Sequence, residues 1–231
     1  MPAVPPVSYS SQQGGQAYRV PCESAVAPRA RPVWATAIKR TLDIFAAVFG
    51  LLILSPLLVV VAAVVKLQDR GPILHRRRVV GANGSFDAFK FRSMHPNADQ
   101  VLESDPVLRR SFQEQFKLRN DPRVTPIGSL LRKHSLDELP QLFNVLLGQM
   151  SLVGPRMITE PELEKYGEHQ PLLLSVKPGL TGYWQVKGRQ NVGYKQRVAM
   201  DIHYIQHWSL TLDLRILLQT PWKVLKGEGA L

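Results

Sequence analysis

The chain has 231 residues, a formal net charge of +11 and an isoelectric point near 10.0. Its single cysteine, Cys22, excludes a disulfide framework and cysteine-based metal sites. The positive charge is compatible with nucleic acid, anionic lipid or a phosphorylated substrate as partner. Because the sequence carries no signature of a DNA- or RNA-binding fold, we expect no nucleic-acid partner.

Residues 1–34 form the first compositional segment. They hold six of the 18 prolines, many small polar residues and little apolar periodicity. Such a composition cannot bury enough apolar surface to offset the entropy of ordering the chain. We therefore predict a disordered tail over residues 1–34, followed by a membrane anchor over residues 35–70.

The anchor is predicted from an uncharged apolar run, Ile44 to Val65. A straight helix of that length would rise roughly 33 Å, enough to span the hydrocarbon core of a bilayer. Pro56 lacks an N–H group and its ring crowds the carbonyl of Leu52, so the helix must kink there. The hydroxyl of Ser55 is well placed to bond one of the backbone groups that the kink frees.

The charges on either side of the run indicate its topology. Cationic residues lie on both sides: Arg29, Arg31, Lys39 and Arg40 before it, and Lys66, Arg70, Arg76, Arg77 and Arg78 after it. Cationic flanks prefer the cytoplasmic side, and a kinked helix that enters and leaves through one face satisfies both. We predict a re-entrant helix–break–helix with its break at Ser55-Pro56. A single-pass helix is the alternative, and a buried core helix is less favoured because the run is apolar on every face.

The remainder, residues 71–231, is predicted to be a mostly helical α+β domain. Two β-prone runs, Ile73 to Val80 and Ser85 to Ser93, surround Asn83-Gly84, which indicates a β-hairpin. The expected helices cover residues 97–119, 128–148 with a break around Pro140, 160–176, and 195–225. Trp208 and Trp222 in the last segment are typical of interfacial amphipathic helices, although a packed core is an equal alternative.

Asp137 and Glu138 are the leading candidates for chemistry. Adjacent residues on a helix point about 100° apart, so the two carboxylates can do different work. One could attack phosphorus while the other holds a magnesium ion, and the nearby Arg132 could neutralise phosphate charge. The alternative is a capping box with Ser135 at the N-cap and Glu138 at N3, which Pro140 disfavours.

Three further basic positions stand beside turns or strands. Lys90 ends the second hairpin run, Arg156 follows Gly154-Pro155, and Arg189 follows Gly188 in a glycine-rich region. Turns of this kind bring backbone N–H groups and a cation to a phosphate. Together with the acidic pair they indicate a diphosphate substrate. Asp201 and Asp213 lie in the C-terminal helices, where the plainest role is pairing with a nearby cation.

These residues together resemble the small monotopic phosphoglycosyl transferases, or bacterial sugar transferases. The matching stretches are Lys39 to Asp43, Ser55-Pro56, Lys90 to Met94, Ser135 to Asn144, Met150 to Arg156, Lys177 to Arg189 and Trp208 to Asp213. The resemblance covers the chain from about residue 36 to its end. One departure is Met157, where the family usually has proline, and we expect it to loosen the loop beside Arg156.

The resemblance implies that a UDP-sugar gives galactose- or glucose-1-phosphate to undecaprenyl phosphate and releases UMP, as the first membrane step of exopolysaccharide synthesis. It implies Asp137 as the nucleophile of a phosphosugar-aspartyl intermediate and Glu138 as a ligand of Mg²⁺. Lys90, Arg132, Arg156 and Arg189 match basic positions that bind phosphates or orient the carboxylates. Asp201 matches a further acidic position of the site.

The resemblance also implies a monotopic location. We expect a catalytic domain on the cytoplasmic face of the bacterial inner membrane, in contact with membrane lipid and with downstream glycosyltransferases as further partners. A non-catalytic membrane scaffold of a polysaccharide assembly complex is the alternative function. The sequence indicates neither the sugar nor the oligomeric state.

Overall fold

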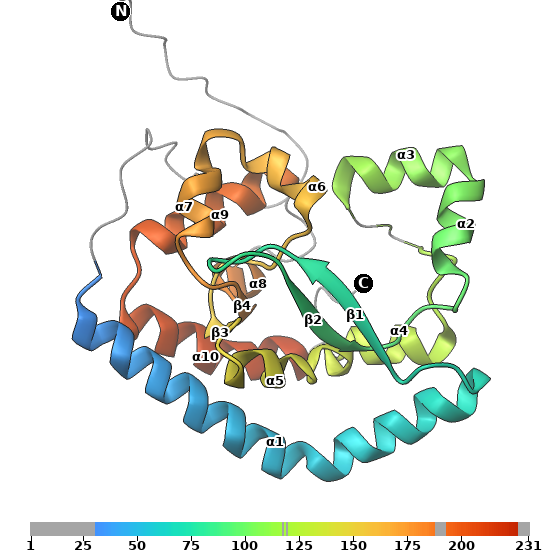
Figure 1. The fold of residues 1–231 in the computed structure, drawn as a ribbon, viewed down its shortest axis with the longest axis horizontal. Helices are drawn as coiled ribbons and strands as arrows, with labels where there is room; N and C mark the ends of the chain where they lie inside the picture. Colours follow the sequence, from blue (N-terminus) through green and yellow to red (C-terminus); the bar gives the residue numbers. More distant parts are fainter. Residues whose placement is uncertain (1–30, 117, 119, 188–192, 226–231) are drawn as a thin grey trace, which may run out of the picture.

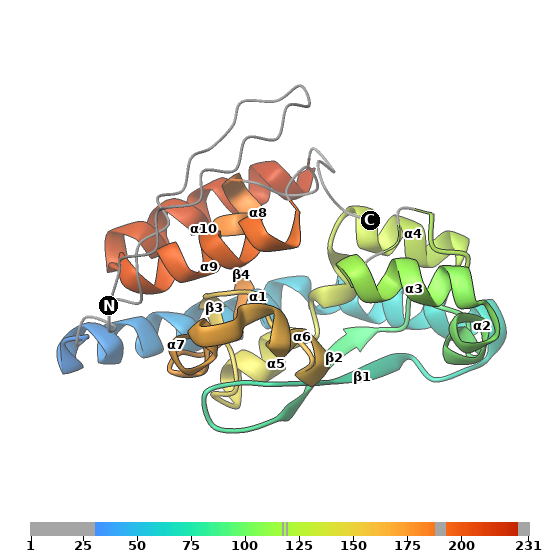
Figure 2. The same ribbon diagram turned by 90° about the horizontal axis from the view of Figure 1, so that it is seen from above.

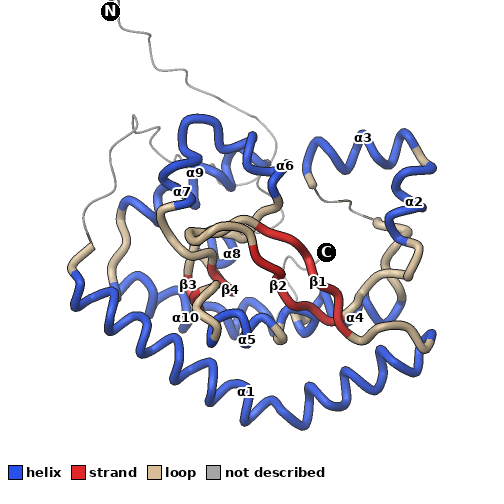
Figure 3. The backbone as a smooth tube through the Cα atoms, in the orientation of Figure 1, coloured by secondary structure: helices blue, strands red, loops and turns tan. Residues whose placement is uncertain are grey.

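A computed structural model describes residues 31–116, 118, 120–187 and 193–225. It is mostly helical and contains two small two-stranded sheets, as Figures 1 and 3 show. The predicted α+β class with a small hairpin is confirmed. Residues 1–30 of the predicted tail lie outside the described residues.

Helix α1, Val33–Asp69, is long and apolar enough to cross a membrane and exposes most of its apolar side chains. It continues through Pro56, and Figure 1 shows it bent around one side of the molecule. The Ser55 hydroxyl donates to the carbonyl oxygen of Leu52 at 2.8 Å, as the sequence predicted. The predicted break is therefore a bend within a continuous helix.

Polar side chains dock the N-terminal half of α1 on the rest of the molecule. Lys39 Nζ donates to Asp213 Oδ2 at 2.6 Å and to the carbonyl oxygen of Val153 at 2.9 Å. Arg40 donates to two carbonyl oxygens at the end of α5, Gln141–Leu146. The buried Asp43 accepts from the backbone N–H of Leu152 at 3.0 Å.

The C-terminal end of α1 docks on the same body. Its last residue, Asp69, pairs with both terminal nitrogens of the buried Arg92. Val61 and Val65 pack in a small apolar cluster with Phe91 and Leu131. Both ends of the bent helix are therefore held against one body.

The hairpin follows α1. Strands β1, Leu74–Val79, and β2, Phe86–Phe91, pair antiparallel, and Gly81 and Gly84 exchange two backbone hydrogen bonds of 3.2 Å in the turn. Gly84 has φ +97°, a conformation that suits glycine and explains the Asn-Gly signal. The predicted hairpin is confirmed.

The predicted helix over 97–119 is wrong as a single element. The structure has α2, Ala98–Ser104, and α3, Pro106–Gln115, with the chain turning at Asp105. The Asp105 carboxylate accepts from the N–H groups of Val107 and Leu108, and Pro106 takes the first helical position. An N-cap followed by proline starts a new helix, and here it outweighs the continuing amphipathic pattern.

The later helices are also shorter than predicted. The 128–148 segment contains α4, Pro126–Lys133, the 3₁₀ turn η1, Leu136–Glu138, and α5. The 160–176 segment contains α6, Glu160–Leu163, η2, Glu164–His169, and α7, Gln170–Leu174. The 195–225 segment corresponds to α9, Tyr194–Gln206, and α10, Leu210–Leu225, and a short helix not predicted, α8, Tyr183–Lys187, lies before it in the glycine-rich region.

A second sheet, not predicted, joins distant segments. Strands β3, Ser151–Val153, and β4, Gly179–Thr181, pair in parallel. A Cβ atom on Gly179 would lie 2.1 Å from the backbone nitrogen of Gly154, so this close approach requires glycine. Seen from above, α9 and α10 lie on one side of α1, with α5 and the hairpin on the other (Figure 2). The main core fills the space between these elements.

Gly128 provides a test of the packing of α4 on the exit of β2. A Cβ atom there would lie 1.9 Å from the carbonyl oxygen of Ser93. Helix propensity alone would make Gly128→Ala stabilising by about 1 kcal/mol, but we expect this backbone clash to dominate and destabilise by roughly 1–3 kcal/mol. The measurement is the thermal unfolding midpoint in detergent. Ser129→Ala, exposed on the same helix, is the control, and a raised midpoint for Gly128→Ala would contradict the packing.

Candidate active site

The acidic pair lies on η1, against the end of the hairpin. Ser135, which precedes this turn, has φ +53°, in the left-handed region that serine rarely adopts. Its side chain makes no capping hydrogen bond, so the capping-box alternative is not formed. The Glu138 carboxylate instead accepts from Lys90 Nζ at 2.5 Å. The left-handed residue turns the chain so that the Asp137 carboxyl is buried and Glu138 faces β2.

The two carboxyls have different electrostatic environments. Burial raises the pKa of Asp137 to about 6; Glu138 adds to the rise, and Lys90 and Arg132 oppose it. Burial also favours the protonated form of Glu138, but Lys90 and the nearby Arg156 hold its pKa below the ordinary value. At neutral pH both are charged, and Asp137 is the more basic.

A group of cations surrounds this pair. The hairpin register puts His75 opposite Lys90 and Arg77 opposite Ala88, so these side chains share one face of the sheet. Arg132, on α4, donates from Nε to the Ser93 hydroxyl at 2.9 Å. Burial lowers the pKa of Arg132, which the charges of Asp137 and Asp121 oppose. A guanidinium stays charged in proteins nonetheless, so the pair lies in a strongly positive field.

Arg156 extends this cluster from the other side. It follows Gly154-Pro155, and its backbone pairs with Gly179 of the second sheet. Its guanidinium lies 5.3 Å from the ring centroid of Trp184 on α8. The partly buried Met157 packs against the main core, and Ile158 bridges to Val80, so the segment is held on both sides of Met157.

Asp201 lies behind Arg156. Its carboxyl, which is fully buried, accepts from the Arg156 backbone N–H at 3.3 Å and from the Tyr166 hydroxyl at 2.8 Å. Burial raises its pKa to about 7 against these hydrogen bonds and the charges of Arg156 and Arg197. Asp201 therefore positions Arg156. Asp213, by contrast, pairs with Lys39, which confirms the expected role as a partner of a cation.

The structure thus brings together Lys90, Arg132 and Arg156 around Asp137 and Glu138. Arg189 lies outside the described residues. Ser55 and Pro56 are in α1, where they form the bend rather than part of this cluster.

Sequence reasoning missed two further basic residues of this region. Arg77 donates to the buried Glu162 at 3.1 Å and contributes to the field on Glu138. The period-2 alternation of the predicted strand could have placed it beside Lys90. Arg197, on α9, lies 4.9 Å from the Trp184 ring centroid, so both it and Arg156 contact one indole. No sequence signal identified Arg197, because its place depends on the packing of α9 on α8.

The acidic pair fits a Mg²⁺ ion shared with a substrate. Among the described residues there is no group of three histidine, cysteine or carboxylate side chains that could form an all-protein metal cage. Mg²⁺ commonly takes one or two carboxylates and completes its shell with waters and phosphate oxygens. Asp137 and Glu138 supply carboxylates of that kind.

Comparison with known proteins identifies the family. The family model described as bacterial sugar transferase matches residues 34–227. The chain belongs to this family.

Several relatives are 40–46% identical to it over the aligned residues. The exopolysaccharide production protein ExoY of Sinorhizobium fredii is 46% identical over 83% of this chain and 87% of its own length. The undecaprenyl-phosphate galactose phosphotransferase of Salmonella typhimurium is 46% identical over 84% of this chain and 42% of its own length. The UDP-glucose:undecaprenyl-phosphate glucose-1-phosphate transferase of Escherichia coli is 40% identical over 84% of this chain and 41% of its own length. The chain thus spans less than half of the latter two.

Asp201→Asn tests the buried carboxyl behind Arg156. A pKa of about 7, above the ordinary value near 3.9, means that the folded protein holds the proton longer than the unfolded chain. Stability from this group is therefore lost as pH rises from about 4 to 7. We expect the thermal unfolding midpoint of Asp201→Asn, compared with that of the wild type at the same pH, to be higher at pH 8 than at pH 5. A difference independent of pH would contradict this assignment, and the partly exposed Asp87→Asn, expected to change stability by no more than ~0.5 kcal/mol, is the control.

Proposed function

We propose that this protein transfers a sugar-1-phosphate, with galactose or glucose as the sugar, from a UDP-sugar to undecaprenyl phosphate and releases UMP. The carrying observation is the buried Asp137 carboxyl, with a pKa of about 6, beside the Glu138–Lys90 pair. The names of the Salmonella typhimurium and Escherichia coli relatives support this chemistry. We place this reaction at the first membrane step of exopolysaccharide synthesis. The family membership and the name of the Sinorhizobium fredii relative support this placement.

Asp137 is the proposed nucleophile. Its carboxylate oxygen attacks the phosphorus that carries the sugar, and the bond from that phosphorus to the bridging oxygen breaks. UMP leaves with this oxygen and the bonding electron pair. An oxygen of undecaprenyl phosphate then attacks the same phosphorus and releases the Asp137 carboxylate. The covalent intermediate lets UMP leave before the lipid phosphate enters, so one site serves both substrates.

The cations would stabilise the negative charge on the phosphates of the substrate. Lys90, Arg132 and Arg156 would bind the phosphate oxygens, and Arg189 is proposed to join them. Glu138 would hold Mg²⁺, whose charge would help to stabilise the departing phosphate. Because Lys90 contacts one Glu138 oxygen, it orients this carboxylate and leaves the second oxygen for the metal.

We further propose that α1 enters and leaves the bilayer through its cytoplasmic face. The support is the docking of both ends: Lys39 and Asp43 near its start, and Asp69 at its end, all bind the same body. A straight spanning helix would put these ends on opposite sides of a membrane. The body would then lie on the cytoplasmic surface, where UDP-sugar from water and lipid phosphate from the leaflet both reach it.

Exposed apolar side chains on other helices support the same orientation. Leu130 of α4, Phe143 of α5, Leu147 directly after α5, and Leu214 and Trp222 of α10 are exposed. Figure 1 shows α4, α5 and α10 next to α1. These helices would lie in the interface plane with their apolar faces against the acyl chains. Trp208, by contrast, packs against the main core, so the core alternative holds for this tryptophan.

The reaction is tested by UMP release from UDP-galactose and UDP-glucose, with undecaprenyl phosphate and Mg²⁺. We expect one of them to support turnover, and Asp137→Asn to reduce it by at least about a thousandfold because the nucleophile is lost. Without the lipid, the wild type should release about one UMP per protein and gain the mass of one hexose phosphate. Asp87→Asn, expected to remain active, is the control.

Each other outcome is informative. Full turnover in Asp137→Asn would refute the nucleophile assignment. Turnover without a mass gain or a UMP burst would favour direct transfer. A folded protein in lipid that releases no UMP from either sugar would favour the non-catalytic scaffold.

The topology is tested with the native cysteine. Cys22 precedes α1, and a second variant, Cys22→Ser with Ser111→Cys, carries its thiol on the exposed face of α3. In intact cells we expect a membrane-impermeant maleimide to label neither protein, and in permeabilised cells to label both. Labelling of Cys22 in intact cells, without labelling of the Ser111→Cys protein, would show a single-pass helix.

A further inference from the structure

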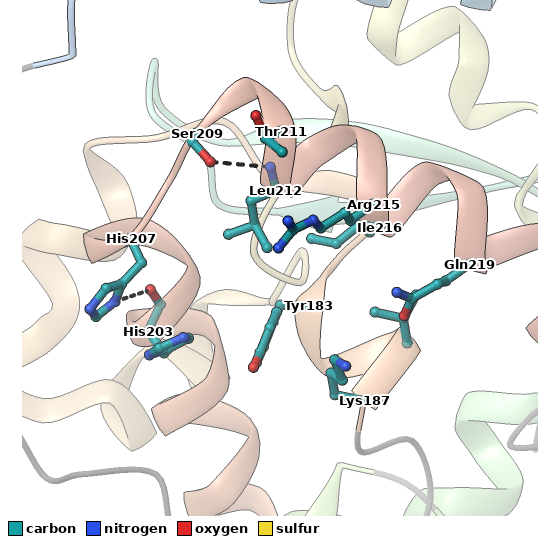
Figure 4. A pocket seen from close by; sticks show the side chains of 11 residues that line it. Tyr183, Lys187, His203, His207, Ser209, Thr211, Leu212, Arg215, Ile216 and Gln219 are labelled. Atoms are coloured by element: carbon teal, nitrogen blue, oxygen red, sulfur yellow. Dashed lines mark hydrogen bonds between the residues drawn. The ribbon is translucent and has the colours of Figure 1, made fainter.

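A cavity lies apart from the acidic pair. It has a volume of about 380 Å³ and is formed by α8, α9, α10 and the segment before α10 (Figure 4). Its lining includes Tyr183, Lys187, His203, His207 and Arg215. None of the lining residues belongs to η1, α4 or the hairpin, which build the candidate active site.

The lining of this cavity is suited to an anion. Figure 4 shows His203, Lys187 and Arg215 arranged around Tyr183. The rings of His203 and His207 stack with centroids 4.2 Å apart. The described lining contains two cations, Lys187 and Arg215, and no aspartate or glutamate. A phosphate would meet two opposite charges and hydroxyl or imidazole donors there.

The position of the cavity on α10 indicates where the anion comes from. Leu214, Leu218 and Trp222 are spaced by four residues and form one exposed apolar stripe of the helix. Arg215 and Gln219 form the adjoining stripe, which lines the cavity. If the apolar stripe enters the acyl boundary, the adjoining stripe lies at the depth of the lipid headgroups.

We propose that this cavity binds the phosphate headgroup of an anionic membrane lipid. Lys187 and Arg215 contact the phosphate, and the stripe of Leu214, Leu218 and Trp222 contacts the acyl chains of the same leaflet. The inference rests on the membrane association proposed above. Anionic lipid attracts cations at the membrane surface, and a concave site with two of them selects the headgroup from a zwitterionic background.

Helix α8 joins this cavity to the arginines near the acidic pair. Tyr183 and Lys187 line the cavity, while Trp184, between them in sequence, contacts both Arg156 and Arg197. A bound headgroup would therefore hold α8 on a face next to the one that contacts these arginines. In this proposal, lipid bound in the cavity holds α8, and with it the contact of Trp184 with Arg156, at the membrane surface.

The test uses the full chain in nanodiscs of phosphatidylcholine, with or without 30% phosphatidylglycerol. Hydrogen exchange is followed in the peptides that cover residues 183–187 and 210–219. We expect phosphatidylglycerol to slow exchange in both peptides, and the Lys187→Gln/Arg215→Gln variant to lose this protection, with about tenfold or greater weakening of lipid binding. Lipid retained by each protein is measured in parallel by native mass spectrometry.

The matched control is Arg109→Gln/Arg110→Gln. It removes the same charge from the exposed face of α3, which Figure 1 shows far from α1, and should keep the protection. Equal loss in this control, or undiminished protection in Lys187→Gln/Arg215→Gln, would overturn the site. Protection by millimolar inorganic phosphate in pure phosphatidylcholine, without an effect of phosphatidylglycerol, would assign the cavity to a soluble anion instead. Incorporation into nanodiscs and UMP release are scored separately, so failure of the membrane or catalytic proposal is distinguishable.

Discussion

The docking of both ends of α1 on one body is the constraint from which the rest of the arrangement follows. The helix is apolar over most of its length, and several of its charged residues bind the rest of the molecule. Lys39 and Asp43 bind the second sheet and α10, and Asp69 binds the end of the hairpin. Because the largely buried Lys39–Asp213 pair and the buried Asp43 carboxylate are costly to leave without a partner, they fix where the start of the helix meets the body. The bend at Pro56 then allows a single helix to reach both docking points.

The same docking connects the anchor to the acidic pair. Arg92, which holds Asp69, follows directly on β2, the strand that ends with Lys90 and Phe91. Lys90 in turn holds Glu138, and Ser93 accepts from Arg132. One short segment, 90–93, therefore carries the contact with the anchor, the cation on the acidic pair and the partner of a second cation. This explains in physical terms why Lys-Phe-Arg-Ser is a compact motif.

Most features decided by neighbouring residues could be predicted from the sequence, whereas pairings between distant segments could not. Asn83-Gly84 predicted the hairpin because the turn is decided by the residues within it, and Ser55 was correctly expected to serve the backbone freed by Pro56. Asp105-Pro106 is an equally local signal, but the amphipathic pattern continues across it and predicts a single helix where the structure has two. The left-handed Ser135, the β3–β4 pair and the contact of Lys39 with Asp213, 174 residues apart, depend on packing. The sequence predicted the acidic pair and the three cations that the structure places around it, whereas Arg197 could not be predicted, since only the packing of α9 places it.

A helix that is bent and held by both ends at one surface displaces lipid from one leaflet only. In the proposed topology α1 acts as a wedge: it enlarges the area of the leaflet it enters and leaves the opposite leaflet unchanged. Such an asymmetry favours membrane that bulges toward the side on which the body lies. The lipids of the entered leaflet are already loosely packed in such membrane. Insertion of this protein is then a function of membrane shape as well as of composition, and many copies on one patch would tend to bend it.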